Sequence, residues 1–469
     1  MRILLVSHAY PPHSTAGTET YTAGLAERLV ARGHAVEVFT TVKDVGRSQF
    51  ELARRVVNGV PVHELVNNLY YRDFRATWDD PPAEAPFQRV LDALRPDVVH
   101  VQHLLYTSSG ILARARAAAP VVYTLHDYWL QCPRFGHRVH ADGAVCRTID
   151  VDRCGTCLAS FKWGQSGLER RVGNLIARVH GATGVDLAPL ARGAAERARR
   201  MRPSARPPVE PPREQAEEFA RAARTRLDEL RARAVANVDL FLATSRFLRD
   251  RLVQESGLPA DRVEHLPLGV DLAAFSPAQR VPRGARVRVA FVGTRTPLKG
   301  PLLLLEAWLA LPPAVRERAE LVLAGPDHHE PDYQRTLAAL AERAGARLFG
   351  RRSRAEVAEL LAATDLLVVP SLWYENSPLV ILEAIAARVP LLVSDQGGMA
   401  ELVEPGATGF HFRQGDAADL ARELERAIVE PARLAGLYSR PPQPLSVAEH
   451  VARVEERYAR LVAARSRSA

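Results

Sequence analysis

The chain has 469 residues, of which 47% are hydrophobic and 25% are charged. This length and balance predict two or three folded domains with large cores, and they exclude a chain disordered along most of its length. The formal net charge of +8 favours anionic partners, such as nucleotide phosphates, acidic lipid surfaces or nucleic acid, without choosing among them. No apolar stretch is long enough to span a membrane, and the apolar run at residues 3–6 is too short for a signal peptide, so we expect a cytoplasmic protein.

Short apolar runs alternate with helical patterns in both halves of the chain. In the first half, strands are predicted for RILLVS, AVEVFT, PDVVHVQ and PVVYTLH, and a helix over residues 18–32 ends at Gly33. After residue 285 the strands are VRVAFVG, ELVLAGP, ARLFG, DLLVVPS and PLLVSD. The alternation predicts two doubly wound α/β domains with parallel sheets, which bind ligands at the carboxyl ends of their strands and face each other across a cleft.

A basic stretch at about residues 160–235 separates the two halves. Residues 165–235 hold 15 arginines against 9 acidic residues, a net charge of +6. The pattern predicts two helices, broken by a Pro-rich run at residues 202–214. Either this stretch is a solvated helical excursion, or it contacts a membrane surface or an acceptor. A final helix is predicted over residues 446–464.

The segment LWYENSPLVILEAIA follows the predicted strand DLLVVPS. Ser377 is predicted as the N-cap and Pro378 as the first helical residue, which leaves unsatisfied N–H groups near Leu379 for a phosphate. Glu375 and Glu383 flank this helix start and can both reach one ligand, because carboxylates form strong hydrogen bonds to sugar hydroxyls. The alternative is a pair of surface glutamates.

Two further loops in the second half follow predicted strands. In FVGTRTPLKG, Lys299 and Gly300 open a helix, where a cation opposes the macrodipole unless an anion such as a diphosphate lies beside it. Arg295 belongs to the same loop. In DQGGMAEL, Gly397 and Gly398 permit backbone contact with a donor. A solvent-facing lysine and an ordinary turn are the alternatives.

The first half offers candidates of the same kind. Gly17 and Thr18 lie between the first strand and its helix, where glycine permits a phosphate to approach the backbone. His126 follows a strand directly and can hydrogen-bond a sugar or transfer a proton. His100 and His103 lie near another strand end and are weaker candidates for such a role. Structural roles remain open for all of them.

The four cysteines of the chain, Cys132, Cys146, Cys154 and Cys157, fall within 26 residues. In a cytoplasmic protein such clustering favours a structural zinc site over disulfides. Free thiols, disulfides and an iron–sulfur cluster are the alternatives. Four thiolate ligands would leave the zinc no open position for catalysis, and the site would pin the loop that follows His126.

Taken together, these segments resemble the large family of retaining GT-B glycosyltransferases that includes bacterial mannosyltransferases and sucrose synthases. The order and spacing both fit, and the matching segments are SHAYPPHSTAGTETY, ARGHAVEVFT, DVVHVQH, TLHDYWLQCPR, ATSRFLRDRL, LPLGVD, FVGTRTPLKG, ENSPLVILEA and SDQGGMAEL. The resemblance implies two Rossmann-like domains, with a helical insertion in the first.

The resemblance also implies roles for particular residues. The family's two glutamates, eight positions apart, correspond to Glu375, which would contact the transferred sugar, and Glu383, which would contact the ribose. Backbone contacts to the sugar and phosphates would come from Asn376, Ser377, Pro378 and Leu379.

Other family positions match less completely. Lys299 corresponds to the diphosphate-binding lysine. The family's arginine follows the loop glycine directly, whereas here Thr294 takes that position and Arg295 comes next as its replacement. Gly17 matches the second glycine of the family's N-terminal loop, whose first is Ala16 here. His126 matches the histidine that contacts the donor sugar.

The implied organisation is an acceptor-side domain at residues 1–268, a nucleotide-sugar-binding domain at residues 269–444, and a helix at residues 445–469 packing back on the first domain. The implied activity is that of a retaining hexosyltransferase, independent of metal at the donor site and of any catalytic cofactor. Its leaving diphosphate would be stabilised by cations and a helix N-terminus.

The donor would be a nucleotide-diphosphate sugar, and the acceptor a cell-envelope glycan, a lipid-linked sugar or a natural product. We expect no nucleic-acid partner, and contact with the inner membrane face through the basic insertion is a further candidate. The rival functions are another GT-B enzyme, such as a nucleotide-sugar epimerase or a phosphorylase, and an inactive scaffold that uses the basic stretch and a zinc cluster.

Overall fold

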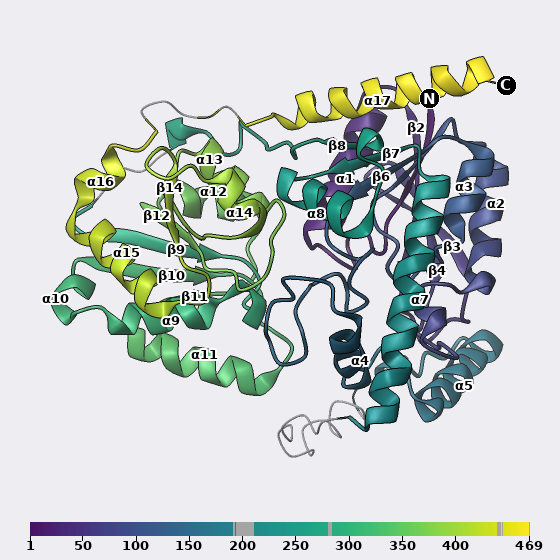
Figure 1. Ribbon diagram of the computed structural model, residues 1–469, viewed down its shortest axis with the longest axis horizontal. Coiled ribbons are helices and arrows are strands. Elements are labelled where there is room, and N and C mark those ends of the chain that lie inside the picture. The colour runs from purple at the N-terminus through teal and green to yellow at the C-terminus, as the bar shows by residue number, and fades with distance from the viewer. Residues whose placement is uncertain (191–192, 194–210, 280–283, 439–441, 443, 469) are drawn as a thin grey trace. The chain divides into compact units, whose positions relative to one another are not determined.

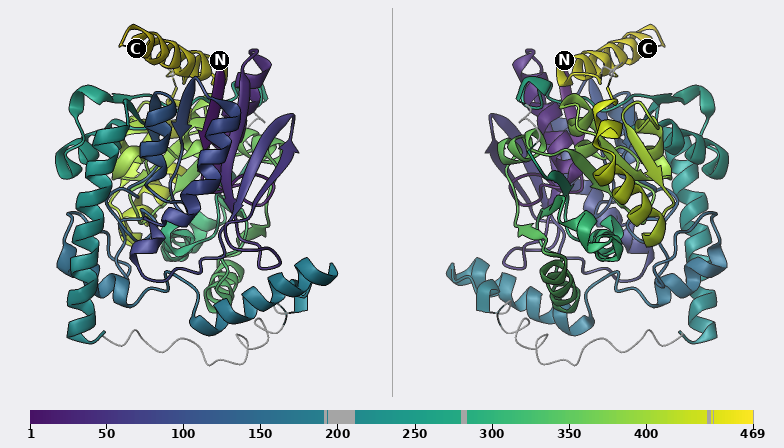
Figure 2. Two further views of the ribbon diagram at one scale, coloured as in Figure 1. Left: turned by 90° about the vertical axis from the view of Figure 1, so that its right-hand side faces the viewer. Right: turned by 90° about the vertical axis from the view of Figure 1, so that its left-hand side faces the viewer.

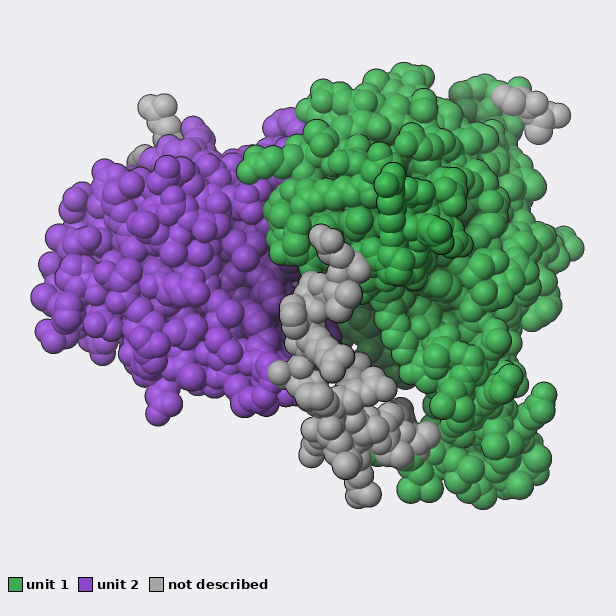
Figure 3. Space-filling model, turned by 60° about the horizontal axis from the view of Figure 1, so that its bottom comes forward, with its two compact units in different colours: residues 1–243, 249–265, 451–469 green, residues 244–248, 266–450 purple. Residues whose placement is uncertain are grey.

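The computed structural model describes residues 1–190, 193, 211–279, 284–438, 442 and 444–468, which divide into two compact units (Figures 1 and 3). Unit 1 comprises Met1–Ala243, Arg249–His265 and Val451–Ala469. Unit 2 comprises Thr244–Leu248 and Leu266–His450. Both are of the α/β class, as predicted. Among the described residues, no helix has the length and apolarity needed to cross a membrane.

The described part of unit 1 is built around an eight-stranded sheet in the order β3-β4-β2-β1-β5-β6-β7-β8. Its strands are β1 (Arg2–Val6), β2 (Ala35–Val42), β3 (Leu52–Val57), β4 (Val60–Val66), β5 (Val98–Val101), β6 (Val121–Leu125), β7 (Leu240–Ala243) and β8 (Val263–His265). The pairing is parallel except for β3, which lies antiparallel to β4. Strands β5 and β6 are buried throughout, as expected in a parallel sheet covered on both faces.

Helices join most of these parallel strands. They are α1 (Gly17–Ala31), α2 (Glu84–Leu94), α3 (Ile111–Ala118), α4 (Val151–Ala159), α5 (Gly167–Thr183), α7 (Arg213–Asn237) and α8 (Arg246–Ser256), with short 3₁₀ turns η1 (Arg75–Thr77), η2 (Pro81–Ala83) and η3 (Ala260–Arg262). Helix α1 spans nearly the predicted residues and is followed by Gly33 at φ 87°, a conformation that favours glycine.

The basic stretch contributes α5 and α7, which lie apart from one another in the side views of Figure 2. A capping box of Ser166 and Glu169 starts α5, and Gly184 ends it at φ 73°. Helix α7 packs instead against α4, where an added Cβ at Gly155 would lie 2.2 Å from the carbonyl oxygen of Ala216. Of the Pro-rich run predicted at residues 202–214, residues 202–210 lie outside the described residues.

In unit 2, the described residues form a six-stranded parallel sheet in the order β11-β10-β9-β12-β13-β14. Its strands are β9 (Val287–Val292), β10 (Ala319–Ala324), β11 (Arg347–Phe349), β12 (Leu366–Val369), β13 (Leu391–Ser394) and β14 (Gly409–Phe412). Strand β14 was not predicted.

The remaining elements of unit 2 cover this sheet. They are η4 (Pro277–Gln279), η5 (Pro297–Lys299), α9 (Pro301–Ala310), α10 (Pro313–Arg316), α11 (Pro331–Ala344), α12 (Arg354–Ala362), α13 (Leu379–Ala386), α14 (Gly397–Leu402), α15 (Ala417–Val429) and α16 (Pro431–Ala435). The apolar residues of α9 and α15 form one core with β9 and β10, centred on side chains such as Leu304, Trp308 and Leu424. This core fixes the strand ends that carry the loops described below.

The last helix, α17 (Val447–Ser468), belongs to unit 1 from Val451 onward. Glu455 forms ion pairs with Arg32 and with His34, and Arg457 forms one with Glu264. The hydroxyl of Tyr458 hydrogen-bonds Nδ1 of His100 at 2.5 Å, and both side chains are fully buried. His100, a weak site candidate from the sequence, thus joins the central strand β5 to α17.

Candidate functional site

Three loops of unit 2 meet at one edge of its sheet because they follow three neighbouring parallel strands. Strand β9 leads to η5, β12 leads through residues 370–378 to α13, and β13 leads to α14. The carboxyl ends of adjacent parallel strands lie side by side, which is where ligands bind in sheets of this type. The candidate residues of the second half of the chain all come from these loops or the helices that follow them.

The carboxylate of Glu375 accepts three side-chain hydrogen bonds on one oxygen. Its Oε1 accepts hydrogen bonds from Nζ of Lys299 at 2.5 Å, from Nε1 of Trp373 at 2.9 Å and from Oγ of Ser371 at 3.0 Å. The ammonium of Lys299 also lies 5.7 Å from the ring centroid of Trp373. Glu375 is buried, whereas about a third of the Lys299 side chain is exposed. The structure therefore brings together two predicted residues and adds Trp373 and Ser371, which were not singled out.

The glycines of these loops permit close packing of backbone on backbone. The N–H of Gly398 donates to the carbonyl oxygen of Glu375 at 2.7 Å, and a Cβ at Gly398 would lie 1.6 Å from the carbonyl oxygen of Asn376. A Cβ added at Gly397, which has φ 66°, would lie 2.7 Å from the carbonyl oxygen of Glu375. Gly300, at φ 70°, would place a Cβ 2.0 Å from the carbonyl oxygen of Pro370. The three loops are therefore locked together by positions that admit no side chain.

Helix α13 starts one residue later than the sequence predicted. It begins at Leu379 with Pro378 as its N-cap, and Ser377 supplies no capping hydrogen bond. Pro378 is extended, with φ −60° and ψ 120°, and a residue that precedes proline, as Ser377 does, is disfavoured in the helical region. The first backbone bond of this turn runs from the N–H of Ile381 to the carbonyl of Pro378, so the N–H groups of Leu379 and Val380 come before the helical hydrogen-bond pattern begins.

Glu383 lies in α13 and is partly buried. Burial raises the pKa of the Glu383 carboxyl from 4.5 to about 7, and the positive charge of Arg354 opposes this only in part. A carboxyl group with such a pKa is present in both protonation states near neutral pH. It can therefore both donate and accept hydrogen bonds with a hydroxyl-bearing ligand.

Arg295 extends away from the Lys299–Glu375 pair. Its guanidinium forms an ion pair with Asp327, which follows β10, and donates to the carbonyl oxygen of Phe349 at the end of β11. These strands lie on one side of β9 in the sheet, whereas β12, which leads to Glu375, lies on the other. The arginine is also buried. In this structure it connects loops of unit 2, and it is not joined to the predicted lysine and glutamate.

In unit 1, His126 lies at the carboxyl end of β6. Its Nε2 donates to Oε1 of Gln102 at 3.0 Å, and the ring of Tyr21 meets it edge-on at 5.1 Å between centroids. Burial, together with the charge of nearby His103, lowers the pKa of His126 to about 3, so this imidazole is neutral at physiological pH.

Further polar side chains, among them two more histidines, lie near His126. Nε2 of His103 donates to Asp127 at 2.9 Å, while its Nδ1 accepts from the N–H of Leu105, which defines the tautomer. His8 follows β1, and its ring lies tilted at 55° to that of His103 with 4.5 Å between centroids. Its Nε2 lies 3.3 Å from a carboxylate oxygen of Glu19. Although burial opposes it, hydrogen bonds from His8 and Ser14 hold the pKa of Glu19 at about 2.

His8, Glu19 and Asp127 were not found from the sequence. The available signal was their position, since His8 and Asp127 come within two residues of strand ends. The predicted Gly17 begins α1, and a Cβ added there would meet nothing within 4 Å. Thr18 lies in the same first turn, where its carbonyl accepts from Thr22. Packing therefore does not require a glycine at this position, and the space beside it is open.

Comparison with known proteins places the chain in a class and then in a family. Two Rossmann-like units with parallel sheets are the GT-B architecture of glycosyltransferases. The structure matches that of Anabaena Alr3699/HepE in complex with UDP and glucose, with a TM-score of 0.61, 18% identity, and coverage of 98% of this chain and 100% of that one. It also matches sucrose-phosphate synthase from Thermosynechococcus elongatus, with a TM-score of 0.63, 19% identity and 99% coverage of both chains.

Residues 16–151 match the family model described as a glycosyl transferase 4-like domain, and residues 275–439 match that of glycosyl transferases group 1. The chain belongs to the GT-B glycosyltransferases of this family-4 type. The D-inositol 3-phosphate glycosyltransferases of Rhodococcus opacus (strain B4) and Geodermatophilus obscurus are 33% and 35% identical to it over 45% and 42% of its length. The matched stretches cover 50% and 46% of those relatives, so the chain spans about half the length of each.

Proposed function

We propose that this protein is a retaining hexosyltransferase that moves a sugar from a nucleoside-diphosphate sugar to an acceptor, and that unit 2 binds the donor. The observation that carries the proposal is the convergence of Lys299, Trp373 and Ser371 on one oxygen of Glu375 at the carboxyl ends of β9 and β12. Family membership and the donor complexes of its structural neighbours support the same assignment.

The Lys299–Glu375 pair is suited to an exchange of partners. When a diphosphate arrives, the partly exposed ammonium of Lys299 can turn from Glu375 to the phosphate oxygens, with which it forms charge-assisted hydrogen bonds. The carboxylate of Glu375 stays oriented by Trp373 and Ser371 and gains capacity to accept from sugar hydroxyls. One event thus prepares both the phosphate site and the sugar site.

The same groups would act in the transfer step. Charge grows on the departing diphosphate, where Lys299 and the first-turn N–H groups of α13 would stabilise it. Glu383 would hydrogen-bond the ribose from the same helix. In our proposal the acceptor attacks on the face from which the diphosphate leaves, a phosphate oxygen takes its proton, and the anomeric configuration is retained without a metal at the donor.

Unit 1 would provide the acceptor side. Its histidines and carboxylates at the ends of β1, β5 and β6 form the kind of dense donor and acceptor array that a polyhydroxylated molecule requires. Neutral His126 would contact the donor sugar by hydrogen bonding, because a proton on both ring nitrogens is disfavoured there. The acceptor would be a glycan, a lipid-linked sugar or a natural product.

Calorimetric titration with UDP, GDP, ADP and TDP tests the donor site. One nucleotide is expected to bind at micromolar strength, and Lys299→Ala is expected to weaken that binding at least tenfold, or about 1.4 kcal/mol. Lys162→Ala is the matched control, since Lys162 forms an exposed pair with Glu169 in unit 1. Equal binding by wild type and Lys299→Ala would contradict the assignment of Lys299, and no binding of any of the four would favour the inactive-scaffold alternative.

The nucleotide that binds then defines the donor sugars for an activity screen. Proton NMR of the product reports the anomeric configuration, and inversion would refute the retaining mechanism. Conversion of a nucleotide sugar without any acceptor would identify an epimerase instead. Dependence on inorganic phosphate as the sugar acceptor would identify a phosphorylase.

We also propose that α5 contacts an anionic membrane surface. Its side chains Leu168, Val172 and Leu175 are 72%, 45% and 62% exposed and recur at intervals of four and three residues, which places them on one face. Arg171 and Arg178 flank this face and are exposed. An exposed apolar stripe bordered by arginines is typical of helices that lie in the interface of an anionic bilayer.

Vesicle sedimentation tests this contact. The protein is expected to bind vesicles that contain phosphatidylglycerol and not vesicles of phosphatidylcholine alone, and Leu168→Glu with Leu175→Glu is expected to abolish binding. Val56→Glu is the control, because Val56 is 66% exposed on β3, outside the basic stretch. Binding that survives the double substitution would show that α5 is not the contact.

A further inference from the structure

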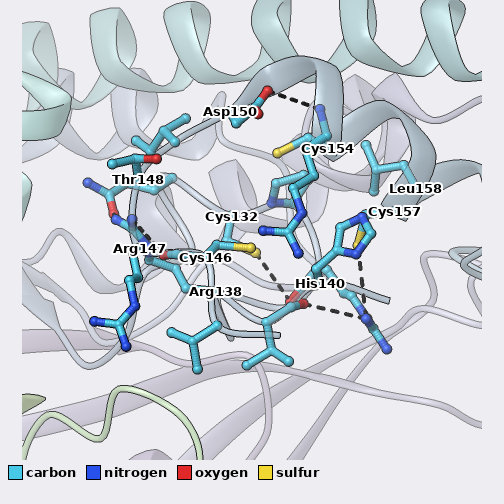
Figure 4. A pocket seen from close by; sticks show the side chains of 17 residues that line it. Cys132, Arg138, His140, Cys146, Arg147, Thr148, Asp150, Cys154, Cys157 and Leu158 are labelled. Atoms are coloured by element: carbon cyan, nitrogen blue, oxygen red, sulfur yellow. Dashed lines mark hydrogen bonds between the residues drawn. The ribbon is translucent and has the colours of Figure 1, made fainter. Parts of the chain in front are cut away.

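All four cysteines of the chain line one cavity of about 220 Å³ in unit 1, shown in Figure 4. They come from three separate pieces of backbone. Cys132 lies in the turn beyond β6, Cys146 directly follows the antiparallel bridge between Val139 and Val145, and Cys154 and Cys157 lie one turn apart on α4. Residues 126–150 form no helix and no strand of the sheet, and turn hydrogen bonds such as that from the N–H of Cys146 to the carbonyl oxygen of Arg138 hold this segment together.

Arginine side chains surround the cavity. Arg226 of α7 is 2% exposed, its Nη2 donates to the carbonyl of Trp129, and its Nη1 has no partner among the described groups. This guanidinium lies 4.8 Å from the ring centroid of Trp129 and forms no ion pair among the described residues. It is close enough to Cys132, Cys154 and the carboxylate of Asp127 for their charges to act on it. An unpaired buried cation is costly unless an anion shares its environment.

Two more arginines point at the same place. Nη1 of Arg134 lies 3.9 Å from Sγ of Cys157, and Arg138, which is also 2% exposed, donates twice to the carbonyl oxygen of Cys146. Arg138 forms an ion pair with Glu255, whereas no described carboxylate forms one with Arg226. The described lining of the cavity holds four arginines, Arg134, Arg138, Arg147 and Arg153, against one carboxylate, that of Asp150. This excess of positive charge favours an anionic centre among the thiols.

We propose that Cys132, Cys146, Cys154 and Cys157 bind one Zn²⁺ as a closed structural site. The four thiols give up four protons as they form four zinc–sulfur bonds, no electron is transferred, and the resulting centre carries a net charge of −2. That charge compensates the buried guanidinium of Arg226. Four thiolates also leave no position for water or substrate, so the site has no catalytic role of its own.

The thiols must move inward to bind the metal. Among the described residues, the one group of three ligand atoms that already lie within 4.8 Å of one another is His328, His329 and Glu330 in unit 2. That group is largely exposed, with 72% of the His329 side chain and 63% of that of Glu330 accessible to solvent. It offers three ligands on one surface loop, whereas the cysteines surround a cavity that arginines line.

The consequence would be a cross-link between three segments. Helix α4 is held against α7 through Gly155, so zinc would fasten the segment after β6 to both helices. That segment starts with His126 and Asp127, and a Cβ at Gly136 would lie 2.8 Å from the carboxyl of Asp127. By fixing the segment that begins with His126 and Asp127, zinc would help to position the histidine and carboxylate array of unit 1.

Metal analysis of the full chain tests the proposal. Protein purified without a metal-affinity step is expected to contain about one zinc per chain, and X-ray absorption is expected to show only sulfur ligands at about 2.3 Å. Cys146→Ser and Cys157→Ser should each lower the zinc affinity at least tenfold in competition with a chelator. The control His328→Ala with His329→Ala should leave the zinc content unchanged.

Several outcomes would overturn the zinc site. These are four thiols that react freely in a metal-free native protein, a Cys154–Cys157 disulfide found by mass spectrometry, iron with visible absorption in place of zinc, or zinc that disappears only in the double histidine variant. Because X-ray absorption is measured on the wild-type protein, the result does not depend on whether the serine variants fold. It is also independent of whether the protein transfers a sugar.

Discussion

Replacing Glu383 by glutamine should stabilise unit 2 in alkaline but not in acidic solution. The pKa of this carboxyl is raised by burial from 4.5 to about 7 in the folded chain. Between these two values the unfolded chain loses the proton while the folded chain keeps it, so the free energy of unfolding falls as pH rises and the loss is complete above pH 7. Glutamine is neutral throughout and escapes this loss.

The size of the effect follows from the pKa shift. One pKa unit corresponds to about 1.4 kcal/mol, so the interval from pH 5.5 to pH 7 costs the wild type about 2 kcal/mol. The gain from Glu383→Gln at pH 8.5, relative to its effect at pH 5.5, should therefore be about 2 kcal/mol. Partial exposure of the side chain makes this an upper value.

Urea unfolding at the two pH values provides the assay. Pulsed hydrogen exchange, followed in peptides from residues 366–412, reports on unit 2 alone. Glu342→Gln serves as the control, because Glu342 is exposed on α11 of the same unit. An equal effect of Glu383→Gln at both pH values, or a loss of stability at pH 8.5, would refute the view that Glu383 is held as a raised-pKa carboxyl.

Two further predictions concern the loops and the unit 1 array. Gly398→Ala should destabilise unit 2 by about 2 kcal/mol or more in thermal unfolding and weaken nucleotide binding, because its Cβ would overlap the Asn376 carbonyl, whereas Gly17→Ala should be tolerated. Nitrogen NMR of His126 should show a neutral ring with no titration between pH 5 and 8, since its pKa is about 3; a midpoint in that range would contradict the burial of the ring.

Much of the fold was predictable because parallel strands buried on both faces appear as continuous apolar runs. The hairpin of β3 and β4 was missed even though its turn, Asn58-Gly59, is a typical two-residue hairpin sequence and both residues have positive φ. Polar residues on β3 and β4 interrupt the apolar run, so periodicity alone gave little signal.

Site residues were predictable only where the family resemblance or a local sequence motif identified them. The resemblance named Lys299 and Glu375, and the structure places their side chains in contact. The array of His8, His103 and Asp127 depends on the order β1-β5-β6, which local sequence does not contain. The contacts of Arg295 could not be predicted either. Its partners Asp327 and Phe349 lie after β10 and at the end of β11, and their proximity depends on the strand order.

The contacts of α17 also determine the order in which the two units can complete their folding during synthesis. Tyr458 caps His100 of the central strand β5, and these two residues are 358 positions apart in the chain. All of unit 2 is therefore made before unit 1 receives this partner. All eight strands of the first sheet are synthesised by His265, but His100 lacks its hydrogen-bond partner on α17 until after the last strand of the second sheet, β14, has been made. Ribosome-bound intermediates arrested before residue 451 should for this reason expose unit 1, rather than unit 2, to proteases and chaperones.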